Sequence, residues 1–189
     1  MAGFDETVDW VVAGSGAGSM ASALVMRKAG KSVLILEKAA LVGGTTAKSG
    51  GVIWIPDNRF MREAGVEDSA EAAIRYLDTV VGDDSGTPGT THEKRLAYVD
   101  EAPKMIDFLV EQGVKLERAS TFWPDYYDEL PGGCKTSRCV VAQLFDTNEL
   151  GPWREKLRPG FLPVPARLEE GRMLPYYKQS WEGRWTFLK

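Results

Sequence analysis

The feature that most constrains the fold is a glycine-rich loop that joins an apolar run to a predicted helix near the N-terminus. The apolar run spans residues 8–13, and the loop GSGAG follows at residues 14–18. Residues 16–29 are mostly small or aliphatic and predict a helix that ends at Gly30, where glycine allows a left-handed exit. A second apolar run at residues 33–36 follows almost at once, within a predicted strand over residues 32–37. This spacing predicts a strand, a helix and a second strand parallel to the first.

A loop in this position is typical of sites that bind the pyrophosphate of an adenine dinucleotide. A helix N-terminus offers unpaired N–H groups and the positive end of the helix dipole. Gly14 and Gly16 occupy the first two positions of the pattern G-x-G-x-x-G, whereas Ser19 replaces its third glycine. Because serine is nearly as small, tight packing of helix on strand remains possible. The motif is weak alone and gains weight from its place between a strand and a helix.

An acid at the end of the second predicted strand supports the same interpretation. Glu37 follows Gly16 by 21 positions, where a carboxylate accepts hydrogen bonds from the ribose hydroxyls of adenosine. Its negative charge also disfavours a 2′-phosphate, which argues against NADP. The alternative is a glycine turn, a capped helix and a surface glutamate that bind no ligand.

A second glycine-rich loop, GGTTAKSGG at residues 43–51, distinguishes an FAD-binding site from an NAD-binding site. A simple nicotinamide-binding domain has no need of such a loop directly after its second strand. Hydroxyls and bare backbone here suit a chain that follows the pyrophosphate and ribityl group towards a flavin ring. The alternative is that these glycines form ordinary turns. The sequence therefore favours FAD.

The remaining chain divides into a helical and an irregular segment. We assign residues 1–57 to a βαβ dinucleotide-binding core, 58–118 to helices and 119–189 to a segment rich in aromatic residues, proline and glycine. The predicted fold is α/β, a Rossmann-like FAD-binding domain with a parallel central sheet, incomplete, and with an irregular C-terminal part.

Local signals place the helices within residues 58–118. Asp68 and Thr90 each precede a glutamate by three positions and are predicted to cap helices that reach residues 81 and 100. Pro103 is placed in the first turn of a further helix, where proline is tolerated. Short strands are predicted at 114–117 and 139–145.

Composition narrows the classes of partner. The 189-residue chain has a net charge of −4, which gives no support for a nucleic-acid partner, because those proteins carry clustered basic faces. The sequence shows no secretory signal and no apolar run near the ~20 residues of a membrane span, so we expect a cytoplasmic protein. The two cysteines, Cys134 and Cys139, are interpreted as reduced thiols, with a redox pair as the alternative. With His92 as the single histidine, we expect neither a metal site nor a catalytic histidine.

The motifs GSGAG, LILEK and GGTTAKSGG resemble those of the fumarate reductase and succinate dehydrogenase flavoprotein superfamily. The stretch FWPDYYDELPGG at residues 122–133, followed by QLFD at 143–146, resembles the 3-ketosteroid 1-dehydrogenase branch more closely. In that branch an aromatic segment that ends in a PGG turn lies beside the flavin. The resemblance extends from Val8 to about Pro159.

The resemblance implies dehydrogenation of a Cα–Cβ bond next to a ketone, in an apolar substrate such as a 3-ketosteroid. Hydride passes from the β-carbon to flavin N5, a base takes the α-proton, and donors hold the enolate oxygen. Tyr126 best matches the tyrosine that the family contributes from this segment, with Tyr127 as the neighbouring alternative. The alternative is that the two tyrosines only pack within an aromatic cluster. Asp125 and the nearby acids are interpreted as solvated turn residues.

The chain departs from the family in length. In the family, the catalytic base, the ketone-oxygen donors, the substrate cap and the closing segment lie beyond the matched region, so none can be assigned here. The chain is therefore either a fragment, whose partner is the remainder of its own enzyme, or a stand-alone remnant, and we expect it to be inactive alone.

Two alternatives stay open. One is a fumarate-reductase-like or other flavoprotein desaturase, which requires convergent arginines; Arg138, Arg158 and four other arginines show no suggestive spacing and are interpreted as surface residues. The other is a non-catalytic dinucleotide-binding fragment. The predicted catalytic residue is Tyr126. The predicted cofactor-binding residues are Gly14, Ser15, Gly16, Ala17, Gly18, Glu37, Lys38, Gly43, Gly44, Thr45, Thr46, Ser49, Gly50 and Gly51.

Overall fold

The computed structural model describes residues 3–82, 88–119, 123–160, 166–171, 174–176 and 178–188. The chain forms two compact units. The first comprises residues 1–50 and 145–165, and the second comprises residues 51–144 and 166–189. Phe122 of the predicted aromatic stretch lies outside the described residues.

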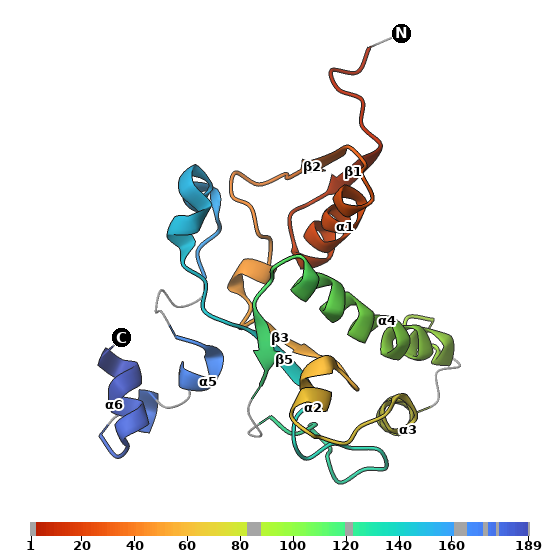
Figure 1. The fold of residues 1–189 in the computed structure, drawn as a ribbon, viewed down its shortest axis with the longest axis vertical. Coiled ribbons are helices and arrows are strands. Elements are labelled where there is room, and N and C mark those ends of the chain that lie inside the picture. The colour runs from red at the N-terminus through yellow and green to blue at the C-terminus, as the bar shows by residue number, and fades with distance from the viewer. Residues whose placement is uncertain are drawn as a thin grey trace. The chain divides into compact units, whose positions relative to one another are not determined.

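The first unit contains the predicted strand, helix and strand (Figure 1). β1 spans Trp10–Ala13, α1 spans Ala17–Lys28 and β2 spans Val33–Leu36. The strands are parallel, with Trp10 opposite Val33 and Ala13 opposite Leu36. Gly30 has a φ of +77° after α1, as predicted for a left-handed helix exit. The βαβ prediction is confirmed.

The parallel pair of strands is only partly buried. Val12 is buried at 6% exposure, but Val11 and Leu36 are 56% and 54% exposed. α1 contacts both strands, and alternation along a strand directs neighbouring side chains to opposite faces. Within the described part of the chain, β1 is therefore not covered on both faces.

A returning segment completes the first unit. It contains the 3₁₀ helix η2 (Thr147–Lys156). A shorter 3₁₀ helix, η1 (Thr46–Lys48), lies earlier in the same unit, after β2. After η2 the chain runs parallel to the loop that follows β2, with Val42 opposite Leu157. The N–H of Val42 donates to the carbonyl of Lys156 at 2.8 Å, and the N–H of Arg158 donates to the carbonyl of Val42 at 2.9 Å. This bridge joins segments that are far apart in the sequence.

The second unit holds a three-stranded antiparallel sheet. β3 (Val52–Trp54), β4 (Leu116–Arg118) and β5 (Cys139–Ala142) are arranged in the order β3-β5-β4. Both pairings with β5 are antiparallel. The predicted parallel sheet is thus limited to β1 and β2 among the described strands. The hydrophobic runs that form β3 and β5 do not reveal strand direction, which depends on how the intervening chain returns.

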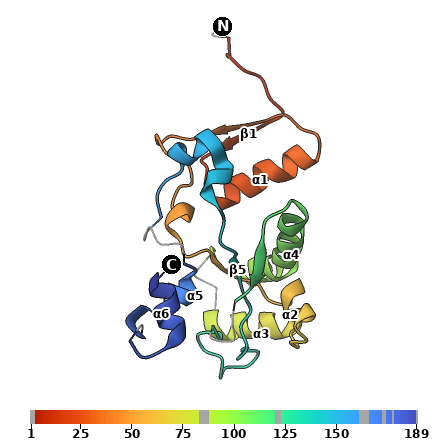
Figure 2. The same ribbon diagram turned by 60° about the vertical axis from the view of Figure 1, so that its left-hand side comes forward.

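Three helices pack around this sheet, and two predicted caps are wrong. α2 spans Arg59–Glu63, α3 spans Ala70–Val81 and α4 spans His92–Glu111. Ser69, not Asp68, caps α3 by accepting from the N–H of Ala72 at 3.1 Å, because Asp68 pairs with an arginine instead. Thr91, one residue later than predicted, is the N-cap residue of α4. α4 lies against α3 (Figure 2).

Pro103 lies in the interior of α4, not in the first turn of a separate helix. Proline removes one helical N–H and usually bends or ends a helix. Here the helix continues for eight residues beyond it, to Glu111. Its neighbours Ala102 and Ile106, one turn apart, are both buried, so packing offsets the missing hydrogen bond.

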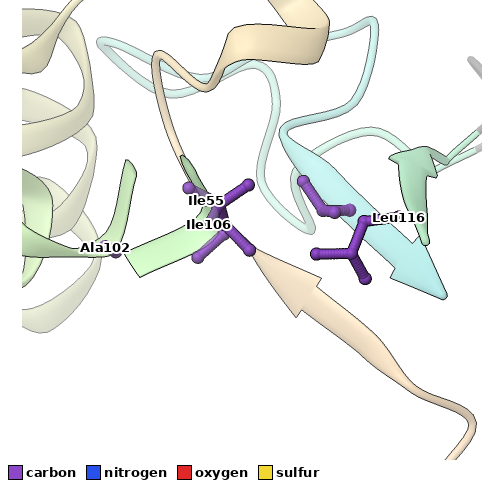
Figure 3. Packing of buried hydrophobic residues seen from close by; sticks show 5 residues of the cluster. Ile55, Ala102, Ile106 and Leu116 are labelled. Carbon is purple, nitrogen blue, oxygen red and sulfur yellow. The ribbon is translucent and has the colours of Figure 1, made fainter. Parts of the chain in front are cut away.

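The core of the second unit lies between α4 and the sheet. Ala102 and Ile106 of α4 and Leu116 of β4 belong to one buried cluster (Figure 3). The cluster also contains Ile55, directly after β3, and Val140 of β5. Ile55, Ile106 and Val140 are fully buried. Spacing of four residues puts the two α4 side chains on one face.

The C-terminal part carries short helices: α5 (Leu168–Gly171), η3 (Leu174–Tyr176) and α6 (Trp181–Leu188). Among the described residues, no helix has the length and apolar character needed to cross a membrane.

Candidate flavin-binding site

The first glycine loop turns directly from β1 into α1. The N–H of Gly14 donates to the carbonyl of Leu36 at 2.7 Å, so the loop stays attached to β2. Gly14 has a φ of +90°, a conformation that favours glycine. Ser19, the residue that breaks the glycine pattern, donates from its hydroxyl to the carbonyl of Ala13 at 3.2 Å. The serine thereby ties helix to strand, which is the packing role of the missing glycine.

The start of α1 is suited to an anion. Its N-cap residue is Gly16, which makes no side-chain cap, and its first turn contains no acid. In contrast, α2 and α3 are capped by Asn58 and Ser69. The first N–H groups of a helix lack partners within the helix. At α1 the N–H of Ala17 donates to Thr46, and the neighbouring N–H groups are left for an outside acceptor, with the helix dipole favouring negative charge.

Ser15 and Glu37 connect the two strands beyond their ladder. The N–H and the hydroxyl of Ser15 both donate to Oε2 of Glu37, at 3.0 and 2.5 Å. The N–H of Ala39 donates to Oε1 at 2.9 Å. A carboxylate has about four acceptor sites, and these contacts use three, so Glu37 retains capacity for a ribose hydroxyl. Its neighbour Lys38 is exposed.

The hydrogen bonds keep Glu37 ionised. The N–H of Ala39, followed by the hydroxyl of Ser15, lowers the pKa of Glu37 below its ordinary 4.5. Hydrogen bonds to the charged form stabilise that form. The residue therefore acts as an acceptor at neutral pH, as a role at ribose hydroxyls requires.

The second glycine loop folds onto the first. The N–H of Gly43 donates to the hydroxyl of Ser15 at 2.8 Å. A Cβ on Gly44 would lie 3.6 Å from Cα of Gly16, so the two backbones are in close contact. The hydroxyl of Thr46 accepts from the N–H of Ala17 at 3.0 Å. Residues 43–46 and the start of α1 thus form one continuous surface.

The other residues of the second loop lie on either side of η1. Thr45 precedes this helix, and the N–H of Ser49 donates to the carbonyl of Thr46 at 3.0 Å. Thr45, Ser49 and Gly50 are exposed. Gly51 belongs to the second unit. The structure therefore brings together the predicted residues from Gly14 to Gly18, Glu37 and the loop from Gly43 to Thr46.

Arg158 is a residue of this region that sequence reasoning missed. Its Nη1 donates to the carbonyl of Gly44 at 3.2 Å across a separation of 114 residues. The bridge between Val42 and Leu157 places it there. It is half-buried, not a free surface residue as predicted. No spacing signal in the sequence connects residues this far apart.

In the second unit, the aromatic stretch forms a tight turn that ends at the PGG motif. Tyr126 is 94% exposed and Tyr127 is 51% exposed. The N–H of Asp125 donates to the carbonyl of Cys134 at 2.9 Å, which closes the turn. Gly132 has a φ of +82°, and a Cβ there would overlap the carbonyl of Ala72 on α3. The turn is therefore seated directly on the α3 backbone.

Arg138 holds this turn in place through hydrogen bonds. Its Nε and Nη2 donate to both oxygens of Asp68, at 2.8 and 2.6 Å, and its Nη1 donates to Oδ2 of Asp125 at 2.6 Å. Nη2 also donates to the carbonyl of Gly132 at 2.8 Å. Arg138 is 1% exposed and Asp125 is 4% exposed. The predictions of a surface arginine and a solvated turn acid are both wrong.

Two aromatic rings complete the arginine site. The guanidinium of Arg138 lies 5.5 Å from the ring centre of Trp54 and 5.7 Å from that of Tyr76. Nε1 of Trp54 donates to Oδ1 of Asp125 at 2.7 Å. Burial opposes the charge, but hydrogen bonds and charge from Asp68 and Asp125 raise the pKa of Arg138 above its ordinary value. The cluster is a paired and satisfied charge network.

The remaining candidate groups have simple contacts. The Cys134 sulfur lies 3.5 Å from the hydroxyl of Thr136, and both cysteines are free. Nδ1 of His92 lies 3.1 Å from Asp78. Among the described residues, no group of three metal-binding side chains was found.

The sequence matches the family described as FAD binding domain over residues 9–176. The chain belongs to this family. As a member of the FAD-binding domain family it has FAD as its cofactor, and the superfamily resemblance is confirmed.

Two curated relatives and one solved structure are similar to this FAD-binding domain. It is 38% identical to 3-oxosteroid 1-dehydrogenase of Mycolicibacterium smegmatis over 85% of this chain and 27% of that protein. It is 42% identical to 4-oxocyclohexanecarboxylate 2-dehydrogenase of Sinomonas cyclohexanicum over 76% of this chain and 24% of that protein. The crystal structure of 3-ketosteroid delta1-dehydrogenase from Sterolibacterium denitrificans aligns with a TM-score of 0.80 at 30% identity, over 96% of this chain and 32% of that one.

The chain thus spans about a quarter to a third of the length of these relatives. Its first unit fits the adenine end of FAD. The start of α1, whose N-cap residue Gly16 makes no side-chain cap, suits the pyrophosphate, and the free acceptor capacity of Glu37 suits a ribose hydroxyl. Both groups lie in the same compact unit.

Proposed function

We propose that the chain is the dinucleotide-binding portion of an FAD-dependent oxidoreductase that dehydrogenates a Cα–Cβ bond next to a ring ketone. The observation that carries this proposal is the junction of two glycine loops at α1, with Glu37 hydrogen-bonded beside it. The relatives that act on 3-oxosteroids support the substrate class.

The residues of the first unit have distinct roles in this proposal. The N–H groups of Gly16 and Gly18 at the start of α1 bind the pyrophosphate, and Ala17 lies between them with its own N–H on Thr46. Glu37 accepts from the adenosine ribose, and Lys38 lies beside it. Thr46 accepts from the N–H of Ala17 and keeps its own proton for a phosphate oxygen. The other loop residues of this unit, Gly43, Gly44, Thr45, Ser49 and Gly50, follow the ribityl group. When bound, FAD supplies the acceptor for a hydride.

Tyr126 is the proposed catalytic residue of the second unit. It is 94% exposed on a turn that is held by Arg138 through Asp125 and Gly132. A phenol on a rigid turn loses little freedom when it positions a substrate or a proton. Since the side chain makes no packing contribution of note, Tyr126→Phe tests its chemistry without loss of stability.

A smaller cyclic ketone is the second candidate substrate. The relative that acts on 4-oxocyclohexanecarboxylate is 42% identical to this chain, and the same desaturation beside a ring ketone applies to both substrates. The fumarate-type alternative is less favoured, because the buried Arg138 already binds two carboxylates of the protein.

The first experiment is titration of the purified 189-residue chain with FAD, followed by flavin fluorescence and absorption. We expect binding of FAD and weak binding of NADPH, because Glu37 repels a 2′-phosphate. Absence of any flavin binding would contradict the proposal. We also expect no turnover of a 3-oxosteroid with an artificial electron acceptor by this chain alone; FAD-dependent turnover would show that it needs no further segment.

A further inference from the structure

Arg158 carries a positive charge to the junction of the two glycine loops. Its Nη1 donates to the carbonyl of Gly44, and Gly44 lies directly against Gly16 at the start of α1. The backbone around Arg158 is held in place, since its N–H donates to the carbonyl of Val42 at 2.9 Å. The guanidinium is therefore positioned by a bridge and not by a loose loop.

Within the part of the chain that the structure describes, no acidic side chain neutralises this charge. Among the described residues, no carboxylate forms an ion pair with Arg158, whereas Arg138, Arg59 and Arg62 each have an acidic partner. One carbonyl occupies a single donor out of the five that an arginine carries. A half-buried, unpaired guanidinium is unusual in a chain with a net charge of −4. The remaining donors are suited to phosphate oxygens, which arginine binds in bidentate fashion.

We propose that Arg158 is a further cofactor-binding residue, which contributes charge and hydrogen bonds to the pyrophosphate of FAD. The proposal rests on the FAD site proposed above. It gives the segment after η2 a function in the first unit: this segment brings a cation to a site whose other contacts come from backbone N–H groups and hydroxyls. Arg154, in the same segment, donates to Asn148 at 2.6 Å and is exposed, so it serves as the matched control.

A purely structural role makes a different prediction. If Arg158 only held the carbonyl of Gly44, glutamine, which keeps a donor but loses the charge, would preserve much of the binding. If the charge acts on the pyrophosphate, glutamine weakens binding and lysine retains part of it.

The test is titration of the 189-residue chain and its variants R158Q, R158K and R154Q with FAD, ADP and adenosine. Flavin fluorescence reports FAD, and calorimetry reports the other two. For R158Q we expect the affinity for FAD and for ADP to fall about tenfold, as for loss of a charge-assisted hydrogen bond. The affinity for adenosine, which lacks phosphate, should be unchanged. R154Q should match the unmodified chain, and R158K should lie between.

Salt gives a second readout. FAD binding by R158Q should depend less steeply on ionic strength than binding by the unmodified chain, because one charge contact is missing. Equal affinities and equal salt dependence for both proteins would overturn the role of Arg158 and leave the FAD site intact. A loss for adenosine equal to that for ADP would identify a structural role and also overturn it. If the unmodified chain bound neither FAD nor ADP, the proposed function itself would fail, and this inference with it.

Discussion

The hydroxyl of Ser15 lies 2.5 Å from Oε2 of Glu37, and the same hydroxyl accepts from the N–H of Gly43 at 2.8 Å. One side chain therefore connects the first glycine loop, the acid after β2 and the second glycine loop. The two loops and Glu37 are joined through this oxygen. Ser15 is buried, with 7% of the residue exposed. The geometry of the cofactor site depends on that oxygen.

Ser15→Ala should destabilise the first unit by about 1–3 kcal/mol, because it removes two hydrogen bonds and leaves the N–H of Gly43 without an acceptor. FAD binding should weaken as the second loop loses its attachment. Urea unfolding and flavin titration measure the two effects. Ser22→Ala is the control, since Ser22 accepts only an exposed hydrogen bond from Trp10; an equal loss in both variants would contradict the special role of Ser15.

Glu37→Gln should remove part of the pH dependence of stability. The folded state lowers the pKa of Glu37 below 4.5, so the stabilisation is present above 4.5 and is lost as pH falls through the lower folded value. The amide of glutamine also places a donor against the donors of Ser15 or Ala39. Melting temperatures of both proteins, measured from neutral pH down through 4.5, should converge in acid. A constant difference across this range would argue against the assignment.

Gly132→Ala should destabilise the second unit by about 2–4 kcal/mol, because a Cβ there overlaps the carbonyl of Ala72 and adds strain at positive φ. Gly113→Ala is a matched control. Gly113 has a φ of +92° but open space around it, so only the conformational cost of about 1 kcal/mol applies. Chemical denaturation measures both. Similar losses would show that α3 yields to the new methyl group.

Arg138→Met should cost about 3–5 kcal/mol of unfolding free energy, because it leaves Asp68 and Asp125 buried without their cation. Adding Asp68→Asn and Asp125→Asn to the same protein should recover part of the loss, since fewer buried charges remain unpaired. Arg59→Met is the surface control; its exposed ion pairs are worth at most about 1 kcal/mol. A triple variant less stable than Arg138→Met would contradict the charge explanation.

Local patterns in the sequence were sufficient for the two strands and the helix at the start of the first unit. The apolar runs, the glycines and Gly30 predicted β1, α1 and β2, because a βαβ unit is specified by short-range periodicity and by positions that require glycine. The antiparallel sheet and the continuous α4 were not predicted. Strand direction depends on chain return, and Pro103 reads locally as a helix start even though burial of Ala102 and Ile106 holds the helix together.

The sequence by itself determined the FAD class of the site, because the two glycine loops and Glu37 carry that information in short local patterns. Only the tertiary structure decided what the isolated polar residues do. Arg158 reaches Gly44 across 114 residues, and Arg138 reaches Asp68 across 70. No local pattern encodes such contacts, because they exist only once separate segments have packed. For this reason two arginines interpreted as surface residues turned out to be half-buried or fully buried beside the two motifs.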